Sequence, residues 1–238
     1  PQLDDEGLLA LRSVLISILR DLSFPLQGLF VLVHLIGKKG GGLRPMSLLH
    51  FLYRVLLRLR FGSALKDWDG TFSDEVPAHD SARAGASAGR ASQLRQSLID
   101  SARLLGLPWI QILWDFQKFY DSLSWYNVIP LARAAGFPLE ALVLIGLLHT
   151  APRMLNHQGG VSEVITGMAL SILAGCVSST RVAKTVTAPP LTVGSVEAGQ
   201  HKGVYSSLGV HVDDITQVHL PSLLPRACLL YTSDAADE

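Results

Sequence analysis

Apolar residues recur every three or four positions along several stretches of the chain, a spacing that predicts amphipathic helices. The first stretch, Leu8–Leu22, ends before Pro25, so we expect a helix that stops there. Ser124 precedes another stretch and is a residue type that caps the start of helices. The helices expected from this spacing cover residues 8–22, 47–61, 92–105, 124–135, 139–149 and 177–186, the last ended by Pro189 and Pro190.

Shorter runs rich in β-branched and aromatic residues predict strands between these helices. The expected strands are 31–36 and 109–116, and the expected hairpins are 153–166, with a turn at 158–160, and 207–220, with Asp213-Asp214 at its turn. Residues 67–92 are rich in Gly, Ala, Ser and Asp and lack periodicity, so we expect a loop there. Helices mixed with hairpins, without an internal repeat or a regular strand–helix alternation, indicate an α+β fold.

Composition sets the size and the class of the protein. The 238 residues suit one large domain or two small ones. Hydrophobic residues make up 48% and charged residues 17%, which is enough apolar surface for a core and is not typical of disorder. The two cysteines, Cys176 and Cys228, are too few for a disulfide framework or a zinc site. The longest apolar run, Leu29–Ile36, is too short to span a membrane. Two isolated thiols are typical of a reduced compartment, so we expect an intracellular protein, nuclear or cytoplasmic.

The overall charge is balanced, but its distribution is not. Twenty basic residues match twenty acidic ones, whereas Leu22–Lys66 contains seven Lys or Arg and no Asp or Glu. A stretch of this kind suits contacts with nucleic-acid phosphates, although a solvated helix face would have the same composition.

Two acidic sites stand out against the apolar strands. Asp115 follows the expected strand 109–116, where its carboxylate emerges at the strand end, and Asp213-Asp214 lie at the tip of an apolar hairpin. Either site alone is compatible with an ordinary cap or a solvated turn. Together they supply carboxylates from two strands, which is what two-metal nucleotidyl transfer requires, with ions roughly 3.5–4 Å apart.

The sequence resembles a known family, the reverse transcriptases of non-LTR retrotransposons. Their first aspartate motif has the form Asp-x-x-Lys-x-Phe-Asp, which corresponds here to Asp115, Lys118, Tyr120 and Asp121, with Tyr120 at the Phe position. Their second motif is aromatic-x-Asp-Asp, and here His211 stands at the aromatic position before Asp213-Asp214.

Two further segments strengthen the resemblance, which covers about residues 30–220. Lys38-Lys39, followed by Arg44-Pro45, is similar to the family's fingers motif. Gly167 and then Ala174–Ser178 resemble the family's motif between the two aspartate sites, with Ala174 in place of the usual Gln. All four motifs occur in the family's order.

The resemblance implies a right-hand polymerase, with fingers in residues 1–110 and a palm in residues 111–220, the palm being an antiparallel sheet packed on helices. It implies an RNA-directed DNA polymerase that adds deoxynucleoside triphosphates to a DNA primer on an RNA template. Two Mg²⁺ ions, or Mn²⁺, would be the cofactors. The residues that the resemblance implies are Asp115, Asp213 and the Phe116 carbonyl at the metals, Asp214 in an assisting role, and Lys38, Lys39, Arg44, Tyr120 and Gly175 at the nucleotide.

Both ends of the sequence lead to an expectation of their own. The chain begins with Pro1, so we expect residues before it to be missing. The segment Cys228–Glu238 resembles an in-frame translation of a sequencing-adaptor DNA, and we expect it to be an unstructured artefact. Only residues 215–227 then follow the Asp-Asp hairpin. Because this is too short for a polymerase thumb, we expect residues 1–227 alone not to extend a primer.

Two alternatives remain open. An RNA-dependent RNA polymerase or an intron maturase uses similar aspartates. A decayed element, catalytically inactive and retaining only nucleic-acid binding, would account for His211 and Ala174. Tyr120, which the resemblance implies lies under the incoming sugar and excludes a 2′-hydroxyl, could equally be a core aromatic residue.

Overall fold

The computed structural model describes residues 3–75, 82, 86–199, 206–212 and 214–219. The chain divides into two compact units, each built from separate parts of the sequence. The first unit contains residues 1–68 and 120–183, and the second contains residues 69–119 and 184–238. The boundary expected near residue 110 between fingers and palm stays a prediction.

The first unit contains helices and a sheet. Its helices are α1 (Asp5–Asp21), the short 3₁₀ helix η1 (Leu26–Gly28), α2 (Phe51–Arg60), α6 (Trp125–Ala134), α7 (Leu139–His149) and most of α5 (Phe119–Ser122). The expected cap is confirmed, because the Ser124 side chain accepts a hydrogen bond from the Tyr126 amide at 3.3 Å. Asp4 caps α1 in the same way, through the Gly7 amide at 2.8 Å.

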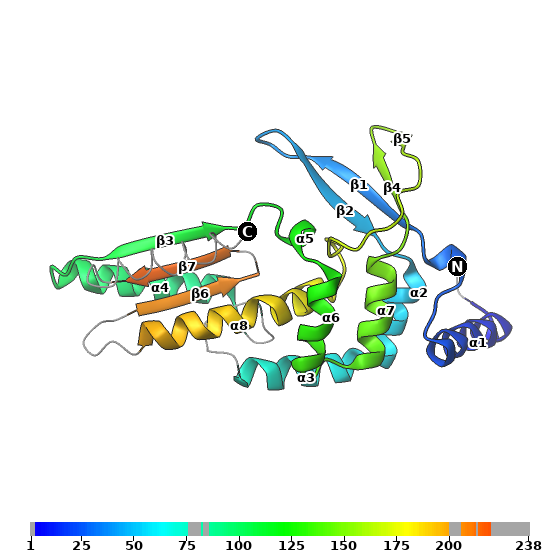
Figure 1. Ribbon diagram of the computed structural model, residues 1–238, viewed down its shortest axis with the longest axis horizontal. Helices are drawn as coiled ribbons and strands as arrows, with labels where there is room; N and C mark the ends of the chain where they lie inside the picture. Colours follow the sequence, from blue (N-terminus) through cyan, green and yellow to red (C-terminus); the bar gives the residue numbers. More distant parts are fainter. Residues whose placement is uncertain (1–2, 76–81, 83–85, 200–205, 213, 220–238) are drawn as a thin grey trace. The chain divides into compact units, whose positions relative to one another are not determined.

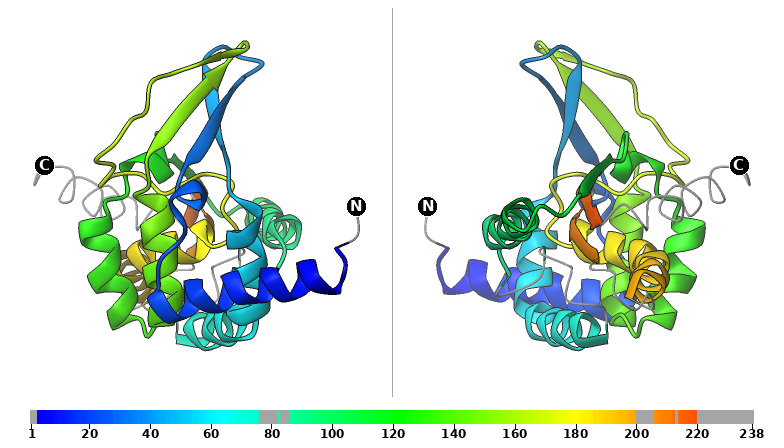
Figure 2. Two further views of the ribbon diagram at one scale, coloured as in Figure 1. Left: turned by 90° about the vertical axis from the view of Figure 1, so that its right-hand side faces the viewer. Right: turned by 90° about the vertical axis from the view of Figure 1, so that its left-hand side faces the viewer.

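A mixed four-stranded sheet completes the first unit. Its strands are β1 (Val31–Gly37), β2 (Leu43–Leu48), β4 (Arg153–His157) and β5 (Gly160–Val161), in the order β2-β1-β4-β5. The β1–β2 and β4–β5 pairs are antiparallel hairpins, and β1 runs parallel to β4. Figure 2 shows the two hairpins rising away from α6 and α7.

The core of the first unit lies around α7 and the segments that pack on it. Leu144, Ile145 and Leu148 of α7 are fully buried, as are Val128 of α6 and Tyr53 of α2. Complete burial of a large apolar side chain stabilises a fold by roughly 1.5–3 kcal/mol. These helices therefore form a firm support for the loops between them.

The second unit contains a three-stranded antiparallel sheet and helix α4 (Ala88–Leu104). The strands are β3 (Ile110–Asp115), β6 (Ser206–His211) and β7 (Asp214–His219), in the order β3-β7-β6 (Figure 1). Helix α4 contacts β6. Helices α3 (Gly62–Glu75) and α8 (Ser179–Gly199) contribute residues to both units. The expected α+β class, with an antiparallel sheet packed on helices, is confirmed.

The structure differs at three places from the elements predicted from the sequence. Residues 47 and 48, expected at the start of the helix 47–61, belong instead to strand β2, which pairs with β1 and tolerates Pro45 as an edge strand, and helix α2 begins at Phe51. Residues 62–75 form α3 where a loop was expected from residue 67. Helix α8 continues past Pro189 and Pro190, whose fixed φ near −65° is close to helical values. No described helix is long and apolar enough to cross a membrane.

Candidate active site

The candidate site lies at one end of the sheet of the second unit. Asp115, the last residue of β3, pairs with Asp214, the first residue of β7, and Asp214 pairs with His211, the last residue of β6. Directly opposed residues on neighbouring strands have Cβ atoms about 4.5–5.5 Å apart and point to the same face of the sheet. The three side chains therefore form a row across three adjacent strands.

All three residues of this row are exposed. Along β3 the accessibility alternates, and Leu113, which shares the face of Asp115, is 71% exposed. Like charges placed directly opposite each other destabilise a sheet, so the pair of Asp115 and Asp214 works against the fold unless a cation offsets the repulsion. Carboxylate oxygens are the ligands that Mg²⁺ and Mn²⁺ prefer, so the row is chemically suited to a divalent cation.

The turn that connects β6 to β7 contains backbone strain. Val212 follows His211 and has a φ of +62°, in the left-handed region that β-branched residues rarely adopt. Left-handed backbone costs an ordinary L-residue roughly 1–2 kcal/mol. Strain of this kind occurs preferentially at functional sites, where the surrounding structure maintains it.

We expect Val212→Gly to raise the free energy of unfolding by about 1 kcal/mol, because glycine adopts positive φ without steric cost. Denaturant unfolding of the chain measures this effect. Val161→Gly is the control, since Val161 is an exposed strand residue without a positive φ and should lose about 0.5–1 kcal/mol. Equal destabilisation by both substitutions would contradict the strain at Val212.

Asp213, which the resemblance implies binds a metal, lies outside the described residues. Among the residues that the structure does describe, no group of three or more His, Cys, Asp or Glu side chains is arranged to hold a metal. The described carboxylates of the row are thus Asp115 and Asp214. Phe116, whose carbonyl is a further expected ligand, follows Asp115 directly, and its side chain is 47% exposed.

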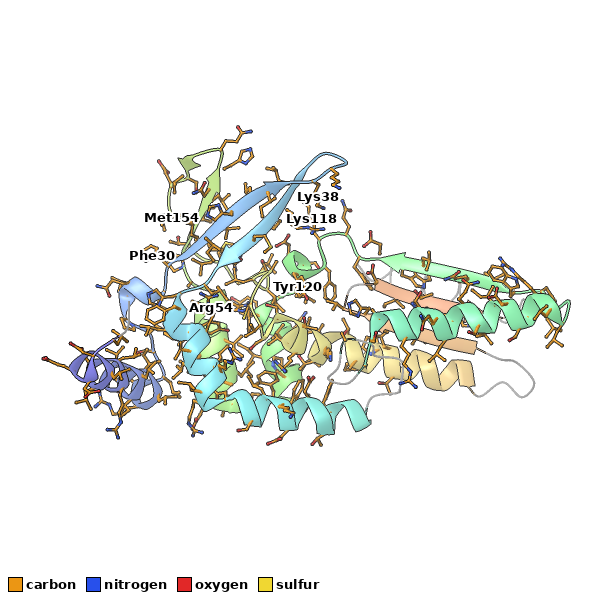
Figure 3. The ribbon with its side chains drawn as sticks, turned by 180° about the vertical axis from the view of Figure 1, so that it is seen from behind. Phe30, Lys38, Arg54, Lys118, Tyr120 and Met154 are labelled. Carbon is orange, nitrogen blue, oxygen red and sulfur yellow. The ribbon has the colours of Figure 1, made fainter. Side chains whose placement is uncertain are left out.

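The basic residues expected at the nucleotide belong to the first unit. Lys38 and Lys39 lie in the turn between β1 and β2, where the Lys38 amide donates to the Gly42 carbonyl at 3.1 Å. Arg44 lies on β2, opposite Ile36. All three basic side chains are exposed. Figure 3 labels Lys38 at the end of the hairpin that projects from the helices.

Tyr120, also in the first unit, is half-buried in α5 (Figure 3). Its carbonyl accepts a hydrogen bond from the Ile172 amide at 2.7 Å, and its hydroxyl lies 3.4 Å from the Thr180 hydroxyl. The neighbouring Asp121 accepts a hydrogen bond from the Ser171 hydroxyl at 3.1 Å. The Tyr120 ring is therefore neither free in solution nor fully in the core.

Gly175 occupies a position where a side chain would be strained and crowded. Its φ is +97°, and a Cβ atom there would lie 3.3 Å from the Ser47 carbonyl oxygen on β2. The Ser47 amide donates to the carbonyl of the adjacent Ala174 at 3.0 Å. This close backbone crossing explains the glycine whether or not the residue contacts a nucleotide.

A buried polar cluster that the sequence did not indicate lies behind Tyr120 and Asp121. The guanidinium of Arg153, on β4, donates to the Ser171 hydroxyl at 3.2 Å and to the His149 carbonyl. Burial lowers the Arg153 pKa, and the nearby Asp121 charge opposes that shift. The cluster links the Asp121 carboxylate through Ser171 to a buried cation. No local pattern marks these residues, because they are brought together only by the fold.

Known proteins resemble this chain in fold. No family model and no curated protein matches the chain. Among solved structures, the matches share the α+β fold of this chain, in which an antiparallel sheet packs on helices.

Telomerases are among the structures that match. An apo telomerase of Candida tropicalis lacking its C-terminal domain superposes with a TM-score of 0.62 at 12% identity, over 87% of this chain and 47% of that one. A Candida tropicalis telomerase bound to a TWJ fragment of telomeric RNA matches with a TM-score of 0.62 at 10% identity, over 94% and 41%. The corresponding Candida albicans complex matches at 0.60 and 10%, over 85% and 38%. The chain thus spans less than half the length of these proteins.

Proposed function

We propose that the chain carries the fingers and palm of an RNA-directed DNA polymerase of the non-LTR retrotransposon type. The observation that supports this most directly is the row of Asp115, Asp214 and His211 at one exposed end of an antiparallel sheet. In this proposal Asp115 and Asp213 bind divalent cations and Asp214 assists. The order of the four sequence motifs and the reverse-transcriptase-like fold support the same function.

Two Mg²⁺ ions, or Mn²⁺, are the cofactors that this donor set fits. When bound, such ions activate a primer hydroxyl and stabilise the charge on a nucleoside triphosphate. The chain's own contribution is to hold two carboxylates, one from β3 and one from β7, side by side at the sheet end. The exposed position of both residues leaves the ions accessible to a primer and a nucleotide.

An RNA template and a DNA primer are the proposed partners. The telomerase neighbours bound to telomeric RNA support an RNA partner, and the basic stretch between Leu22 and Lys66 suits phosphate contacts. Lys38, Lys39 and Arg44 on the β1–β2 hairpin would hold the triphosphate of a deoxynucleotide, and Gly175 would allow its close approach. Tyr120 would lie against the sugar.

Metal binding tests the core of the proposal without requiring polymerisation. In a Mn²⁺ titration followed by electron paramagnetic resonance, Asp115→Asn and Asp214→Asn should each weaken binding by at least about 10-fold, because each removes a charged oxygen ligand. Asp213→Asn should do the same. Asp100→Asn is the matched control, since Asp100 is an exposed carboxylate of the same unit that lies 3.6 Å from Arg103.

The outcomes separate the proposal from its alternative. Loss of Mn²⁺ binding in the three variants, with the control unchanged, supports the polymerase site. The alternative, an inactive product that only binds nucleic acid, is favoured by His211 and Ala174 at positions where the family has an aromatic residue and Gln. Equal Mn²⁺ binding by all the variants, together with salt-sensitive RNA binding, would favour that alternative and contradict the metal site.

A further inference from the structure

Arg95 of helix α4 lies directly over Gly209 of strand β6. A Cβ atom at Gly209 would collide with Nη1 of Arg95 and would lie 3.3 Å from its Cζ. Gly209 is buried, and helix α4 contacts β6, which Figure 3 shows from the α4 side. The guanidinium therefore occupies the space that a Cβ at Gly209 would take, and a larger residue there requires the flexible Arg95 side chain to move.

The face of the sheet under Arg95 is the one that carries the candidate active site. Gly209 pairs with Thr216, which pairs with Leu113, and each of these residues lies two positions from a member of the acidic row. Because side chains alternate along a strand, residues two apart share a face and lie about 6.5–7 Å apart. Arg95 thus lies one step along the sheet from Asp115, Asp214 and His211.

The helix presents Arg95 on its inner side. Ile99 and Ala102, four and seven positions later, are buried, so Arg95 falls on the stripe of α4 that faces the protein. Arg95 itself is half-buried. It forms no hydrogen bond or ion pair with any residue of the described chain. No nitrogen of Arg95 is among the buried polar atoms that lack a partner, so the guanidinium is accessible to water and can reach an anionic ligand from outside.

We propose that Arg95, which lies over Gly209, binds a phosphate group of nucleic acid or nucleotide on the carboxylate face of this sheet. Arginine presents donors in a planar fork that matches phosphate oxygens, and its charge would offset the repulsion between a phosphate and the acidic row. The proposal rests on the polymerase function proposed above and adds a specific anion-binding residue to it. The phosphate belongs either to a strand of the primer–template or to an incoming triphosphate.

Binding measurements with the full chain test this proposal without catalysis. The first probe is a fluorescein-labelled RNA–DNA primer–template duplex, titrated by anisotropy at several salt concentrations. If Arg95 contacts a strand phosphate, Arg95→Ala should weaken binding and reduce the slope of log affinity against log salt by about one. Arg95→Lys should keep the slope, because the charge remains, while losing affinity through the lost bidentate geometry.

Gly209→Ala tests the position of the guanidinium alone, because it displaces the guanidinium and leaves every charge of the chain in place. It should reproduce the Arg95→Ala effect, and it should have no further effect when combined with Arg95→Ala. Arg103→Ala is the matched control on the same helix, because Arg103 is exposed, lies 3.6 Å from Asp100 and stacks on Trp109. It should leave the slope unchanged. Thermal unfolding of each variant verifies that it is folded.

A second titration, with a fluorescent mant-labelled deoxynucleoside triphosphate, distinguishes the source of the phosphate. An Arg95→Ala defect confined to the duplex assigns the contact to a strand, and one confined to the nucleotide assigns it to the triphosphate. If the wild-type chain binds both probes and Arg95→Ala behaves like Arg103→Ala, the role of Arg95 is wrong although the polymerase proposal survives. If the wild-type chain binds neither probe, the polymerase proposal falls as well.

Discussion

Asp69→Asn should lower the free energy of unfolding by about 3–5 kcal/mol, the usual cost of removing one partner of a buried ion pair. Asp69 of α3 and Lys184 of α8 are 6% and 8% exposed, and their charged atoms are 3.5 Å apart. Lys184 also donates to the Ala82 carbonyl at 2.9 Å. The substitution removes the Asp69 charge from beside a buried ammonium in a low-dielectric surrounding, so the second unit should lose much of its stability.

Two comparisons show whether burial causes this effect. Lys184→Met should cost a similar amount, whereas the double variant Asp69→Leu/Lys184→Met should lie within about 1–2 kcal/mol of the wild type, because it replaces both charges of the pair by apolar groups. Arg103→Met breaks the exposed pair with Asp100 and should cost no more than about 1 kcal/mol. Denaturant unfolding measures all four variants. Equal losses for Asp69→Asn and Arg103→Met would show that the buried pair is solvated.

Local periodicity was sufficient to predict much of the fold. The apolar spacing of residues 8–22 gave α1, and the hydroxyl of Ser124 before an apolar run gave the start of α6. The hairpins β4–β5 and β6–β7 followed from turn residues between short apolar runs. These elements are determined by neighbouring residues in the sequence, so a single chain contains the necessary information.

The elements that were missed depend on contacts distant in sequence. Strand β2 contains Pro45 and an exposed arginine, and it is a strand only because β1 pairs with it. In α3, Leu65 and Trp68 have helical spacing and are buried, yet the surrounding Gly, Asp and Ser masked the pattern. The Trp68 indole donates to the Ala135 carbonyl at 2.8 Å, a contact that no local pattern could indicate.

Part of the candidate site was predictable from the sequence, and part of it depends on contacts distant in sequence. A strand-end aspartate and an acidic hairpin predicted that carboxylates from two strands belong together, and the register sets Asp115 opposite Asp214. The contact of Arg95 with Gly209 could not be predicted, because it requires the packing of α4 on β6. Likewise, the bond between Ser171 and Asp121 joins residues fifty positions apart.

The most strongly shifted histidine, His149 of α7, should make the protein sensitive to mild acid. Burial, reinforced by the Arg153 charge, lowers the pKa of His149 to about 3. The neutral ring accepts a hydrogen bond from the Leu173 amide at 3.1 Å and packs edge-on against Trp125. This bond holds the chain next to Ile172, whose amide binds the Tyr120 carbonyl, so protonation of the ring would disturb the support of Tyr120.

The direction of the pH effect follows from the lowered pKa. Above about pH 6.5, His149 is neutral in both the folded and the unfolded chain, so it has no influence on stability. Between about pH 6.5 and pH 3 only the unfolded chain gains a proton there, so the free energy of unfolding falls by up to about 1.4 kcal/mol per pH unit. From pH 7 to pH 5 the wild type should lose about 2 kcal/mol through this residue alone.

His149→Asn isolates that contribution, because an asparagine oxygen can replace the ring nitrogen that accepts from Leu173. The variant should be less stable than the wild type at pH 7, because a smaller side chain leaves a cavity. Between pH 7 and pH 5, however, it should lose about 2 kcal/mol less than the wild type, and His157→Asn, at an exposed histidine, should follow the wild type. Denaturant unfolding at the two pH values gives the comparison. A parallel loss in the wild type and His149→Asn would mean that the ring becomes protonated without unfolding, and the buried cluster behind Tyr120 would then be open to water.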